Sequence, residues 1–326
     1  MVERILAVIP CLNEELYIEA LAEKLVATSR NLPMRIVIAD GGSSDRTPHI
    51  ARELAQKHNN IVFLENPKRL QAAAINLAVA TYGEGAAFLI RIDAHADYPD
   101  DYCNALIDEA EKTGADSVVV AMKTEGKSGF QLAVAAAQNS LLGNGGSAHR
   151  IAGGNGFWTD HGHHALMRIV AFREVGGYDE TFSHNEDAEL DLRLRQSSHK
   201  IWMTGKTLAI YYPRSSPVAL FFQYIRHGKG RARTILKHRA MPKLRQMAPA
   251  AVLPAALLAL LTPFIPIALL PLAIWAVFCL GYGIALGRRA HNGVIALAGP
   301  AAMIMHFGWS VGFWMEMIDY LRKRPR

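Results

Sequence analysis

The sequence predicts an α/β protein, in which a doubly wound, mostly parallel sheet domain is followed by C-terminal transmembrane helices. Short β-branched runs alternate with longer amphipathic segments in the first part of the chain, an order typical of doubly wound sheets that bind ligands at the carboxyl ends of their strands. Residues 247–287 then contain no Asp, Glu, Lys or Arg, whereas one membrane crossing needs only about 20 apolar residues.

The elements of the sheet domain follow from these patterns in chain order. Strands are expected over 5–9, 35–39, 61–64, 87–92 and 117–120, where apolar and β-branched residues run together. Helices are expected over 14–32, 47–58, 70–80, 99–113 and 187–196, with a glycine-rich loop over 143–156 and a turn over 176–179. The loops after Ile9, Ala39 and Ile92 would then meet at one edge of the sheet.

Charge is distributed unevenly along the chain, although the net charge is only +6. Residues 1–191 hold 27 acidic and 16 basic side chains, whereas residues 192–315 hold 15 basic and no acidic ones. The basic block leads into apolar sequence and is not combined with groove-reading elements on a folded domain, so no nucleic-acid partner is expected.

These patterns divide the chain into a domain over 1–215, a basic juxtamembrane segment over 216–247, a membrane region over 248–321 and a basic tail over 322–326. Two or three apolar helices are expected in the membrane region, at about 248–263, 266–286 and 293–315. The positive-inside rule places the basic flanks of the first two in the cytoplasm. A third crossing would put the basic tail outside, a conflict that a re-entrant or interfacial helix, or a hairpin, avoids. Core helices of a large soluble domain are the alternative to membrane spans.

The N-terminus and the cysteines also indicate the cytoplasm. The first residues lack the apolar length and the cleavage site of a signal peptide. Cys11, Cys103 and Cys279 are widely spaced and form no CxxC motif, so free thiols are expected.

The common nucleotide-binding motifs do not match. Gly205-Lys206-Thr207 lacks the P-loop glycine, because Lys200 occupies that position. The glycine string that opens at Gly143 follows a helical segment late in the chain, not the first strand. The sequence therefore supports neither a P-loop triphosphate site nor NAD binding.

Polar residues follow the strand expected over 87–92, at Asp93, His95 and Asp97. If this segment stays extended, residues two apart share a face, so the three side chains project the same way. Carboxylates and an imidazole at one strand end can hold a divalent cation, since Mg²⁺ prefers oxygen ligands and Mn²⁺ tolerates the nitrogen. Two solvated aspartates beside a loop histidine are the alternative.

Four motifs, taken in order, resemble those of family 2 glycosyltransferases of the GT-A fold. They are Pro10-Cys11-Leu12-Asn13-Glu14-Glu15 after the first strand, Asp40-Gly41-Gly42-Ser43-Ser44-Asp45-Arg46-Thr47 after the second, Asp93 with His95, and Asn185-Glu186-Asp187-Ala188-Glu189-Leu190 at a helix start. The resemblance covers about residues 4–240. Within the family, the chain is similar to the ExoA-type enzymes of succinoglycan biosynthesis, which build exopolysaccharide repeats on a polyprenyl diphosphate carrier.

The resemblance implies a nucleotide-sugar site in the first loops. Pro10, Asn13 and Glu14 would line the nucleoside pocket, and Asp40 would hydrogen-bond a uracil-type base, with Ser43 in the same loop. The alternative for the second loop is a turn that caps the helix starting at Thr47, and one loop can do both.

The resemblance also implies a divalent cation, Mn²⁺ or Mg²⁺, as the cofactor. Asp93 would contact both the nucleotide-sugar and the metal. His95 replaces the second acid of the family's metal motif, and Asp97 would supply the missing carboxylate.

Asp187 is the catalytic residue that the resemblance implies. It matches the aspartate of the family's Glu-Asp pair, which is the general base. An acceptor hydroxyl must lose its proton as it attacks the anomeric carbon, and a carboxylate opposite the leaving diphosphate can accept it. The residues implied at the acceptor or the diphosphate are Asp160, His161, Glu186, Gln223, Arg226, Lys229 and Arg231.

Two of these assignments have alternatives. The cations of the Gln223-x-x-Arg226 segment could neutralise a diphosphate or attract anionic lipid. The three histidines at 161, 163 and 164 also suggest zinc, but their spacing is not typical of a zinc site.

The implied reaction is inverting transfer of a hexose, with glucose expected, from a UDP-sugar to a polyprenyl-diphosphate-linked sugar. The protein would lie in the inner membrane with its catalytic domain in the cytoplasm, in contact with membrane lipids and with other exopolysaccharide assembly proteins. The alternatives are a catalytically silent, membrane-tethered nucleotide-sugar-binding scaffold, and a processive polysaccharide synthase, which would need more spans to form a channel.

Overall fold

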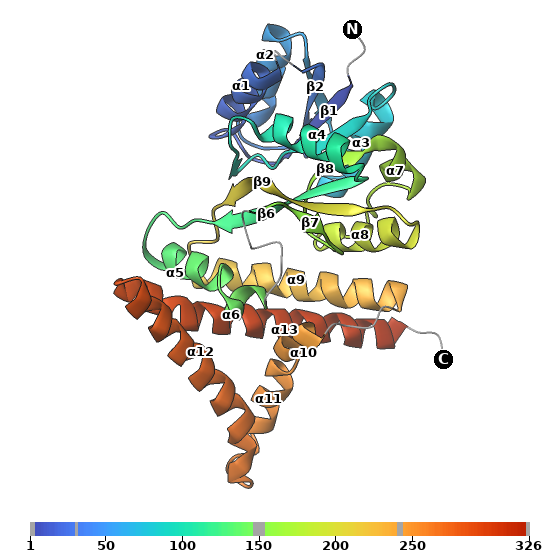
Figure 1. Ribbon diagram of the computed structural model, residues 1–326. Coiled ribbons are helices and arrows are strands. Elements are labelled where there is room, and N and C mark those ends of the chain that lie inside the picture. Colours follow the sequence, from blue (N-terminus) through green and yellow to red (C-terminus); the bar gives the residue numbers. More distant parts are fainter. Residues whose placement is uncertain (1–3, 30–31, 146–153, 240–243, 324–326) are drawn as a thin grey trace. The chain divides into compact units, whose positions relative to one another are not determined.

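The computed structural model of the chain describes residues 4–29, 32–145, 154–239 and 244–323 (Figure 1). Parts of the predicted glycine-rich loop and basic tail, 146–153 and 324–326, lie outside the described residues. The chain divides into two units, one of Met1–Lys123 with Ile151–Tyr211 and one of Thr124–Arg150 with Tyr212–Arg326. The segment Thr124–Arg150, which the sequence prediction included in the first domain, thus belongs to the second unit.

Within the described residues, nine strands form one sheet. They are β1 (Ile5–Cys11), β2 (Met34–Asp40), β3 (Ile61–Glu65), β4 (Phe88–Arg91), β5 (Ala96–Asp97), β6 (Ser117–Thr124), β7 (Phe157–Trp158), β8 (His163–Arg168) and β9 (Ile201–Tyr211). Their order is β3-β2-β1-β4-β8-β6-β9-β5, with β7 paired to β9. Strands β1 to β4 are parallel, whereas β8 is antiparallel to both β4 and β6.

Helices cover both faces of this sheet (Figure 1). They are α1 (Ile18–Ser29), α2 (Thr47–Lys57), α3 (Gln71–Tyr82), α4 (Tyr102–Thr113), α7 (Ile169–Glu174) and α8 (Glu186–Gln196). Ile5, Ala7 and Ile9 belong to the core with α1, α2 and α4, and Leu6 and Val8 belong to the core with α3, α7 and α8. Because β1 is buried on both faces, it is a continuous apolar run. The predicted α/β class is confirmed.

Some element boundaries differ from the predicted ones. Helix α1 begins at Ile18 rather than at residue 14, because the backbone N–H groups of Glu14 and Glu15 donate to the side chains of Thr47 at 2.8 Å and Asp45 at 3.2 Å. Helix α4 begins at Tyr102, after Pro99. Strands β8 and β9 were not predicted, because β8 opens with two histidines and β9 contains Gly205.

The second unit is helical in its described part. Its elements are α5 (Gly129–Gln138), α6 (Leu141–Asn144), α9 (Pro217–His238), α10 (Leu244–Ala250), α11 (Val252–Ala259), η2 (Pro266–Leu269), α12 (Leu270–Arg289), η3 (Gly293–Leu297) and α13 (Ala298–Lys323). One apolar cluster joins Val134 of α5, Leu220 of α9, Cys279 of α12 and Met305 of α13. This packing explains why the segment that holds α5 belongs to this unit.

Among the described residues, two helical segments are long and apolar enough to cross a membrane. They are Pro266–Arg289, with a mean hydropathy of 2.2, and Gly293–Lys323, with 1.5. The segment expected as a first span, 248–263, is a shorter apolar helix, Met247–Ala259, and Pro263 follows its end. All three cysteines are buried and free, as predicted.

Candidate active site

The topology of the first unit brings the motif residues to one edge of the sheet. Parallel strands β1 and β2 end together, with Cys11 opposite Asp40. Strand β8 runs antiparallel to β4, so it begins at the edge where β4 ends, and its first residues are His163 and His164. Helix α8 begins with Glu186 beside these side chains.

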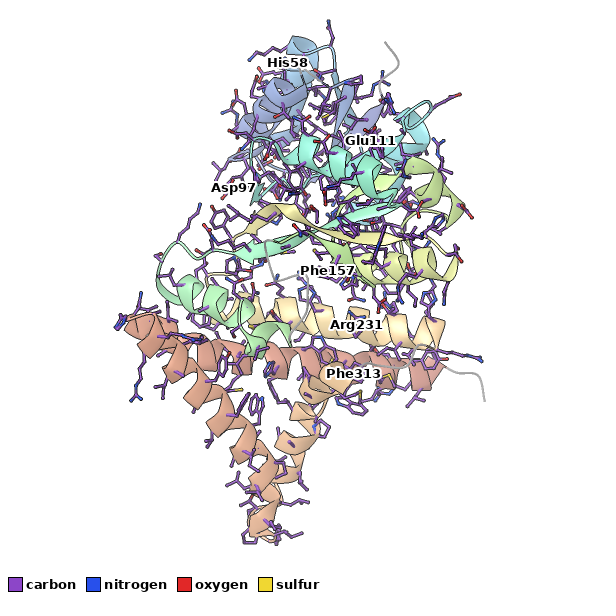
Figure 2. The ribbon with its side chains drawn as sticks, viewed as in Figure 1. His58, Asp97, Glu111, Phe157, Arg231 and Phe313 are labelled. Atoms are coloured by element: carbon purple, nitrogen blue, oxygen red, sulfur yellow. The ribbon has the colours of Figure 1, made fainter. Side chains whose placement is uncertain are left out.

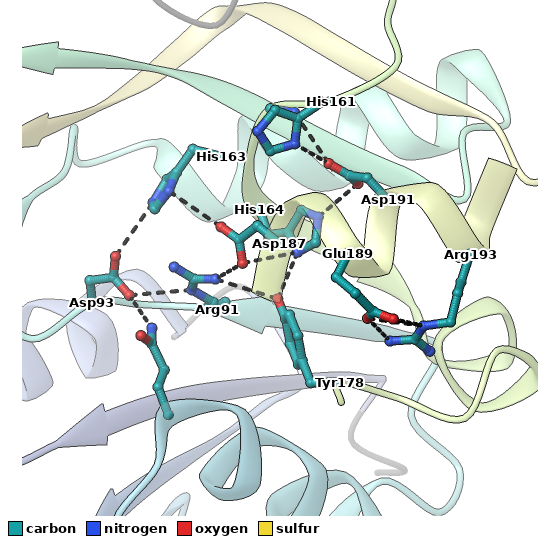
Figure 3. A network of polar contacts seen from close by, with 12 residues as sticks. Arg91, Asp93, His161, His163, His164, Tyr178, Asp187, Glu189, Asp191 and Arg193 are labelled. Carbon is teal, nitrogen blue, oxygen red and sulfur yellow. Dashed lines mark hydrogen bonds and ion pairs between the residues drawn. The ribbon is translucent and has the colours of Figure 1, made fainter. Parts of the chain in front are cut away.

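Arg91, the last residue of β4, lies at the centre of the site (Figure 3). Its side chain is 5% exposed, its Nε lies 3.3 Å from Oδ1 of Asp93, and its Nη1 donates to Oδ1 of Asp187. Nη1 also donates to the hydroxyl of Tyr178 at 3.4 Å. Burial alone would lower the pKa of Arg91, but Asp187 and Asp93 outweigh it and raise this pKa well above its usual value. The guanidinium is therefore a permanent buried cation between two carboxylates.

Asp93 is held from three sides. Besides Arg91, the side-chain amide of Gln71 donates to its Oδ1 at 2.9 Å, and Nε2 of His163 lies 3.5 Å from its Oδ2. Burial would raise the pKa of Asp93, but the charge of Arg91 outweighs it and holds this pKa well below its usual range. Burial lowers the pKa of His163 to about 4, so this imidazole is neutral at pH 7.

Asp187 lies in the first turn of α8, and its side chain is 17% exposed. Its Oδ1 contacts Arg91 and lies 3.5 Å from Nδ1 of His164, whereas its Oδ2 lies 3.9 Å from Nδ1 of His163. Burial raises its pKa, but Arg91 and then His164 and His163 outweigh burial and lower this pKa below its usual value. The helix N-terminus favours the same charged form. Asp187 is thus an ionised carboxylate that can accept a proton.

Glu186, the neighbour of Asp187, has the opposite shift. Burial, followed by the negative charge of Asp187, raises its pKa to about 7. Two adjacent carboxylates whose pKa values are pushed apart are typical of sites that move protons.

A buried chain of side chains extends from this pair toward the surface (Figure 3). Fully buried His164 lies 2.6 Å from the hydroxyl of Tyr178 through Nδ1 and 2.7 Å from Oδ1 of Asp191 through Nε2. Oδ2 of Asp191 lies 2.6 Å from Nδ1 of His161, whose side chain is 31% exposed. Burial opposes ionisation of Asp191, but His164 and His161 outweigh it and lower the pKa of Asp191 to about 2. These side chains fix the position of His164, whose Nδ1 lies 3.5 Å from Oδ1 of Asp187.

The loops after β1 and β2 are hydrogen-bonded to each other. Oγ of Ser43 accepts from the N–H of Asn13 at 2.8 Å, and Oδ1 of Asn13 accepts from the N–H of Ser44 at 2.8 Å. The Asp40 carboxylate is 5% exposed and accepts from the Gly42 N–H at 3.0 Å and from the Ser43 hydroxyl at 2.5 Å. Asp40 therefore organises its own loop, and Pro10 lies beside it at the end of β1. Contact of these residues with a nucleotide stays a prediction.

The predicted arrangement of Asp93, His95 and Asp97 on one extended face is wrong. The chain turns after Asp93, whose C=O accepts from the N–H of Ala96 at 3.2 Å. Nδ1 of His95 lies 3.0 Å from Oε1 of Glu14, and Asp97 is exposed on β5 (Figure 2). Within the described part of the chain, no three His, Cys, Asp or Glu side chains converge as metal ligands. These side chains do not by themselves fit a divalent cation, so no catalytic step is assigned to one.

The predicted acceptor residues fall into two groups. In the first unit, Oδ1 of Asp160 lies 3.7 Å from Nη1 of Arg195, and His161 contacts Asp191 as described above. In the second unit, Gln223, Arg226, Lys229 and Arg231 lie on α9, and their role at a diphosphate stays a prediction.

Sequence reasoning missed the residues that hold the carboxylates: Gln71, Arg91, His163, His164, Tyr178 and Asp191. The sequence does contain a signal for Arg91, because a charged residue at the end of an otherwise apolar strand must be paired when it is buried. Tyr178 lies in the predicted turn, where its N–H donates to Oδ1 of Asn76 at 2.9 Å and its C=O accepts from Nδ2 of Asn76 at 2.8 Å. The turn thus fixes a site residue.

Comparison with known proteins relates this site to a family. The sequence profile described as "Glycosyl transferase family 2" matches residues 6–176, about half of the chain. The chain belongs to glycosyltransferase family 2. Succinoglycan biosynthesis protein ExoA of Rhizobium meliloti (strain 1021) is 59% identical over 320 residues, which are 98% of this chain and 96% of that protein. The predicted family is confirmed, and this family 2 chain is a glycosyltransferase.

Solved structures confirm the GT-A fold. Mannosyltransferase PcManGT from Pyrobaculum calidifontis, in complex with GDP-Man and Mn²⁺, has a TM-score of 0.60 at 18% identity, over 97% of this chain and 87% of that one. GalNAc-T7 with UDP, GalNAc and Mn²⁺ has a TM-score of 0.54 at 14% identity, over 78% of this chain and 51% of that one.

Proposed function

We propose that this glycosyltransferase moves a hexose, with glucose from UDP-glucose expected, onto a polyprenyl-diphosphate-linked sugar in exopolysaccharide biosynthesis. The observation that carries the proposal is the near-full-length similarity to a protein of succinoglycan biosynthesis. The solved complexes with GDP-Man and with UDP support a nucleotide-sugar donor. The basic flanks of the apolar helices support an inner-membrane location with the catalytic domain in the cytoplasm.

In the proposed mechanism, a hydroxyl of the acceptor attacks the anomeric carbon of the donor from the face opposite the diphosphate. The new C–O bond forms as the bond to the diphosphate oxygen breaks, and the hydroxyl proton passes to Asp187. This single displacement inverts the anomeric centre.

The contacts of Asp187 suit this role. Arg91 and His164 hold its Oδ1, whereas its Oδ2 has a longer contact of 3.9 Å, to His163. Its lowered pKa makes it a weak base toward a free alcohol, but the attacking oxygen gains positive charge as its new bond forms, and its proton becomes acidic. We assign proton transfer to Oδ2, which Arg91 keeps in place by fixing the other oxygen.

We also propose a divalent cation, Mn²⁺ or Mg²⁺, as the cofactor. Two similar folds hold Mn²⁺, and Asp93 is the predicted ligand whose low pKa keeps it ionised. Titration of UDP into the protein with and without Mn²⁺ tests this proposal. Equal affinity for UDP in both titrations would refute the proposal that a divalent cation is the cofactor.

Inverted membrane vesicles supplied with radiolabelled UDP-glucose and a membrane lipid extract test the reaction. Wild-type protein should give labelled lipid, and Asp187→Asn should abolish the product. Asp108→Asn, the same chemical change on the exposed side of α4, should leave the yield unchanged. UDP binding without labelled lipid in the wild type would favour the scaffold, and a long labelled polymer would favour a processive synthase.

A further inference from the structure

Helix α13 is apolar enough to cross a membrane, and it packs closely against α9. A Cβ at Gly308 would lie 2.7 Å from the carbonyl oxygen of Phe221, and one at Gly312 would lie 2.0 Å from that of Ile225. Arg233 then binds Glu316 at 2.9 Å. These contacts advance in the same direction along both helices, so α9 and α13 run parallel with their backbones touching. Whatever position α9 takes relative to a bilayer, α13 shares it.

Helix α9 cannot be a membrane span. Only the five residues 212–216 separate its start at Pro217 from the end of strand β9 at Tyr211. Five residues span at most about 18 Å, less than the hydrocarbon core of about 30 Å, so the N-terminus of α9 and the sheet domain are on the same side of a membrane. From Arg226 onward it carries five basic residues, Arg226, Lys229, Arg231, Arg233 and Lys237. A charged side chain at the centre of a bilayer costs about 2.5–3.5 kcal/mol even on the lowest scale. Both ends of α9 therefore lie on one side of the membrane, and the helix lies along the surface with α13 beside it.

This position removes the conflict over the C-terminal charges. Arg288 and Arg289 end α12, and Arg322 and Lys323 end α13. If α13 crossed the bilayer, the two basic pairs would lie on opposite sides, against the positive-inside rule. With α13 in the membrane plane, both pairs lie on the cytoplasmic side together with the basic residues of α9.

The remaining apolar segment is a hairpin, in which α11 and α12 converge at a turn away from α13 (Figure 1). Its first arm is fixed to α13 where Ser310 accepts from the N–H of Leu253 at 3.0 Å. Its second arm is fixed where a Cβ at Gly299 would lie 2.6 Å from the carbonyl oxygen of Cys279.

The parts of the hairpin that extend beyond its contacts with α13 are short. Residues 253–261 of the first arm extend about 13 Å from α13, at 1.5 Å per residue. Residues 266–279 of the second arm, of which four form the 3₁₀ helix η2, extend about 23 Å. The hydrocarbon core of a bilayer is about 30 Å thick. A hairpin that starts at the membrane surface therefore ends inside the bilayer.

The turn of the hairpin is suited to hydrocarbon. It holds no charged residue, and the side chains of Phe264 and Leu260 are 84% and 71% exposed. Backbone N–H groups that lie in lipid must be satisfied internally. Those of Leu260, Leu261 and Thr262 donate to carbonyls at the end of α11, and those of Phe264 and Ile265 donate to the carbonyl of Leu261. Pro263 and Pro266 have no N–H.

We propose that the second unit enters the membrane only as a re-entrant hairpin of α11, η2 and the first half of α12, whose turn ends within the lipid. Helices α9 and α13 lie in the plane of the cytoplasmic surface. The inference rests on the membrane attachment within the proposed function, and it does not depend on the donor, the acceptor or turnover.

Labelling of single introduced cysteines with a membrane-impermeant maleimide tests the inference in the full chain. Phe264→Cys marks the turn, Leu260→Cys is a second probe there, Ala290→Cys marks the end of α12 and Lys323→Cys the end of α13. The native thiols are buried, so the wild-type chain gives the background. Spheroplasts expose the outer face, inverted vesicles the cytoplasmic face, and SDS-treated membranes give full labelling.

The inference predicts that both turn cysteines stay below a tenth of their full labelling from either face, and that Ala290→Cys and Lys323→Cys label only in inverted vesicles. Labelling of a turn cysteine in spheroplasts would show a complete crossing by the hairpin and overturn the inference. Labelling of Lys323→Cys in spheroplasts would overturn the in-plane position of α13, and labelling of the turn in inverted vesicles would overturn insertion. Because labelling needs no turnover, loss of transferase activity would not alter these results.

Discussion

Replacing Arg91 by methionine tests whether a buried cation holds the two site carboxylates in place. Arg91 is 5% exposed and pairs with both Asp93 and Asp187. Removing one partner of a buried ion pair costs about 3–5 kcal/mol, because the other charge is left uncompensated. We expect Arg91→Met to lower the free energy of unfolding by about this amount at pH 7.

The loss should also depend on pH in a defined direction. In the wild type, the pKa values of Asp93 and Asp187 lie below their unfolded values. Their contribution to stability is therefore fully present above about pH 4 and is lost as the pH falls through the folded values. Without Arg91, burial dominates and raises both pKa values, so the variant loses stability as the pH rises. The difference between the two proteins should shrink from pH 7 to pH 4.

Hydrogen–deuterium exchange of peptides from β4 and α8, in the detergent-solubilised chain, measures this difference. Arg52→Met is the matched control, because Arg52 is half exposed and pairs with Glu65 at 2.9 Å, and such a surface pair contributes about 0–1 kcal/mol. The reasoning is refuted if Arg91→Met stays within about 1 kcal/mol of the wild type at pH 7, or if the difference widens toward pH 4.

Three further predictions concern residues around the site and in the second unit. The pKa of Glu186 is raised to about 7, and its ionisation adds a negative charge beside Asp187 that makes Asp187 a stronger base, so the transfer rate of the wild type should rise as the pH passes through about 7 and Glu186→Gln should remove this rise; an unchanged profile would contradict the influence of Glu186 on Asp187. Asp191→Asn should lower the pKa of His164, since burial then outweighs the remaining negative charge of Asp187, and NMR titration of the histidines should show the shift; an unshifted or raised pKa would contradict it. Gly312→Leu should separate α9 from α13 and speed amide exchange in both, whereas Gly281→Leu, whose Cβ would meet nothing within 4 Å, should not; equal exchange in the two variants would refute the close packing.

The sequence was informative about the loops that follow the parallel strands β1 and β2. Cys11 and Asp40 come together because β1 and β2 end at one edge, and strand ends can be read from apolar runs. Through the antiparallel pairing of β8 with β4, His163 reaches Asp93 and His164 reaches Asp187. No short-range pattern determines that register, so these two histidines could not be assigned.

Two other features depend on tertiary packing. The prediction for Asp93, His95 and Asp97 assumed an extended segment, but the chain turns there and His95 binds Glu14 across 81 residues of sequence. Hydropathy likewise cannot show whether α13 crosses the membrane, and our inference that it does not rests on the close contact of Gly312 with Ile225 of the basic helix α9.

The rate of sugar transfer by Asp187→Asn at saturating UDP-glucose tests the central claim most directly. A general base contributes about 10²–10⁴-fold to a rate, so a loss of that size is expected, with the affinity for UDP unchanged. Glu186→Gln, measured beside it above pH 8, should lose less than about tenfold. A loss below tenfold for Asp187→Asn, or a larger loss for Glu186→Gln, would contradict the assignment of Asp187 as the proton acceptor.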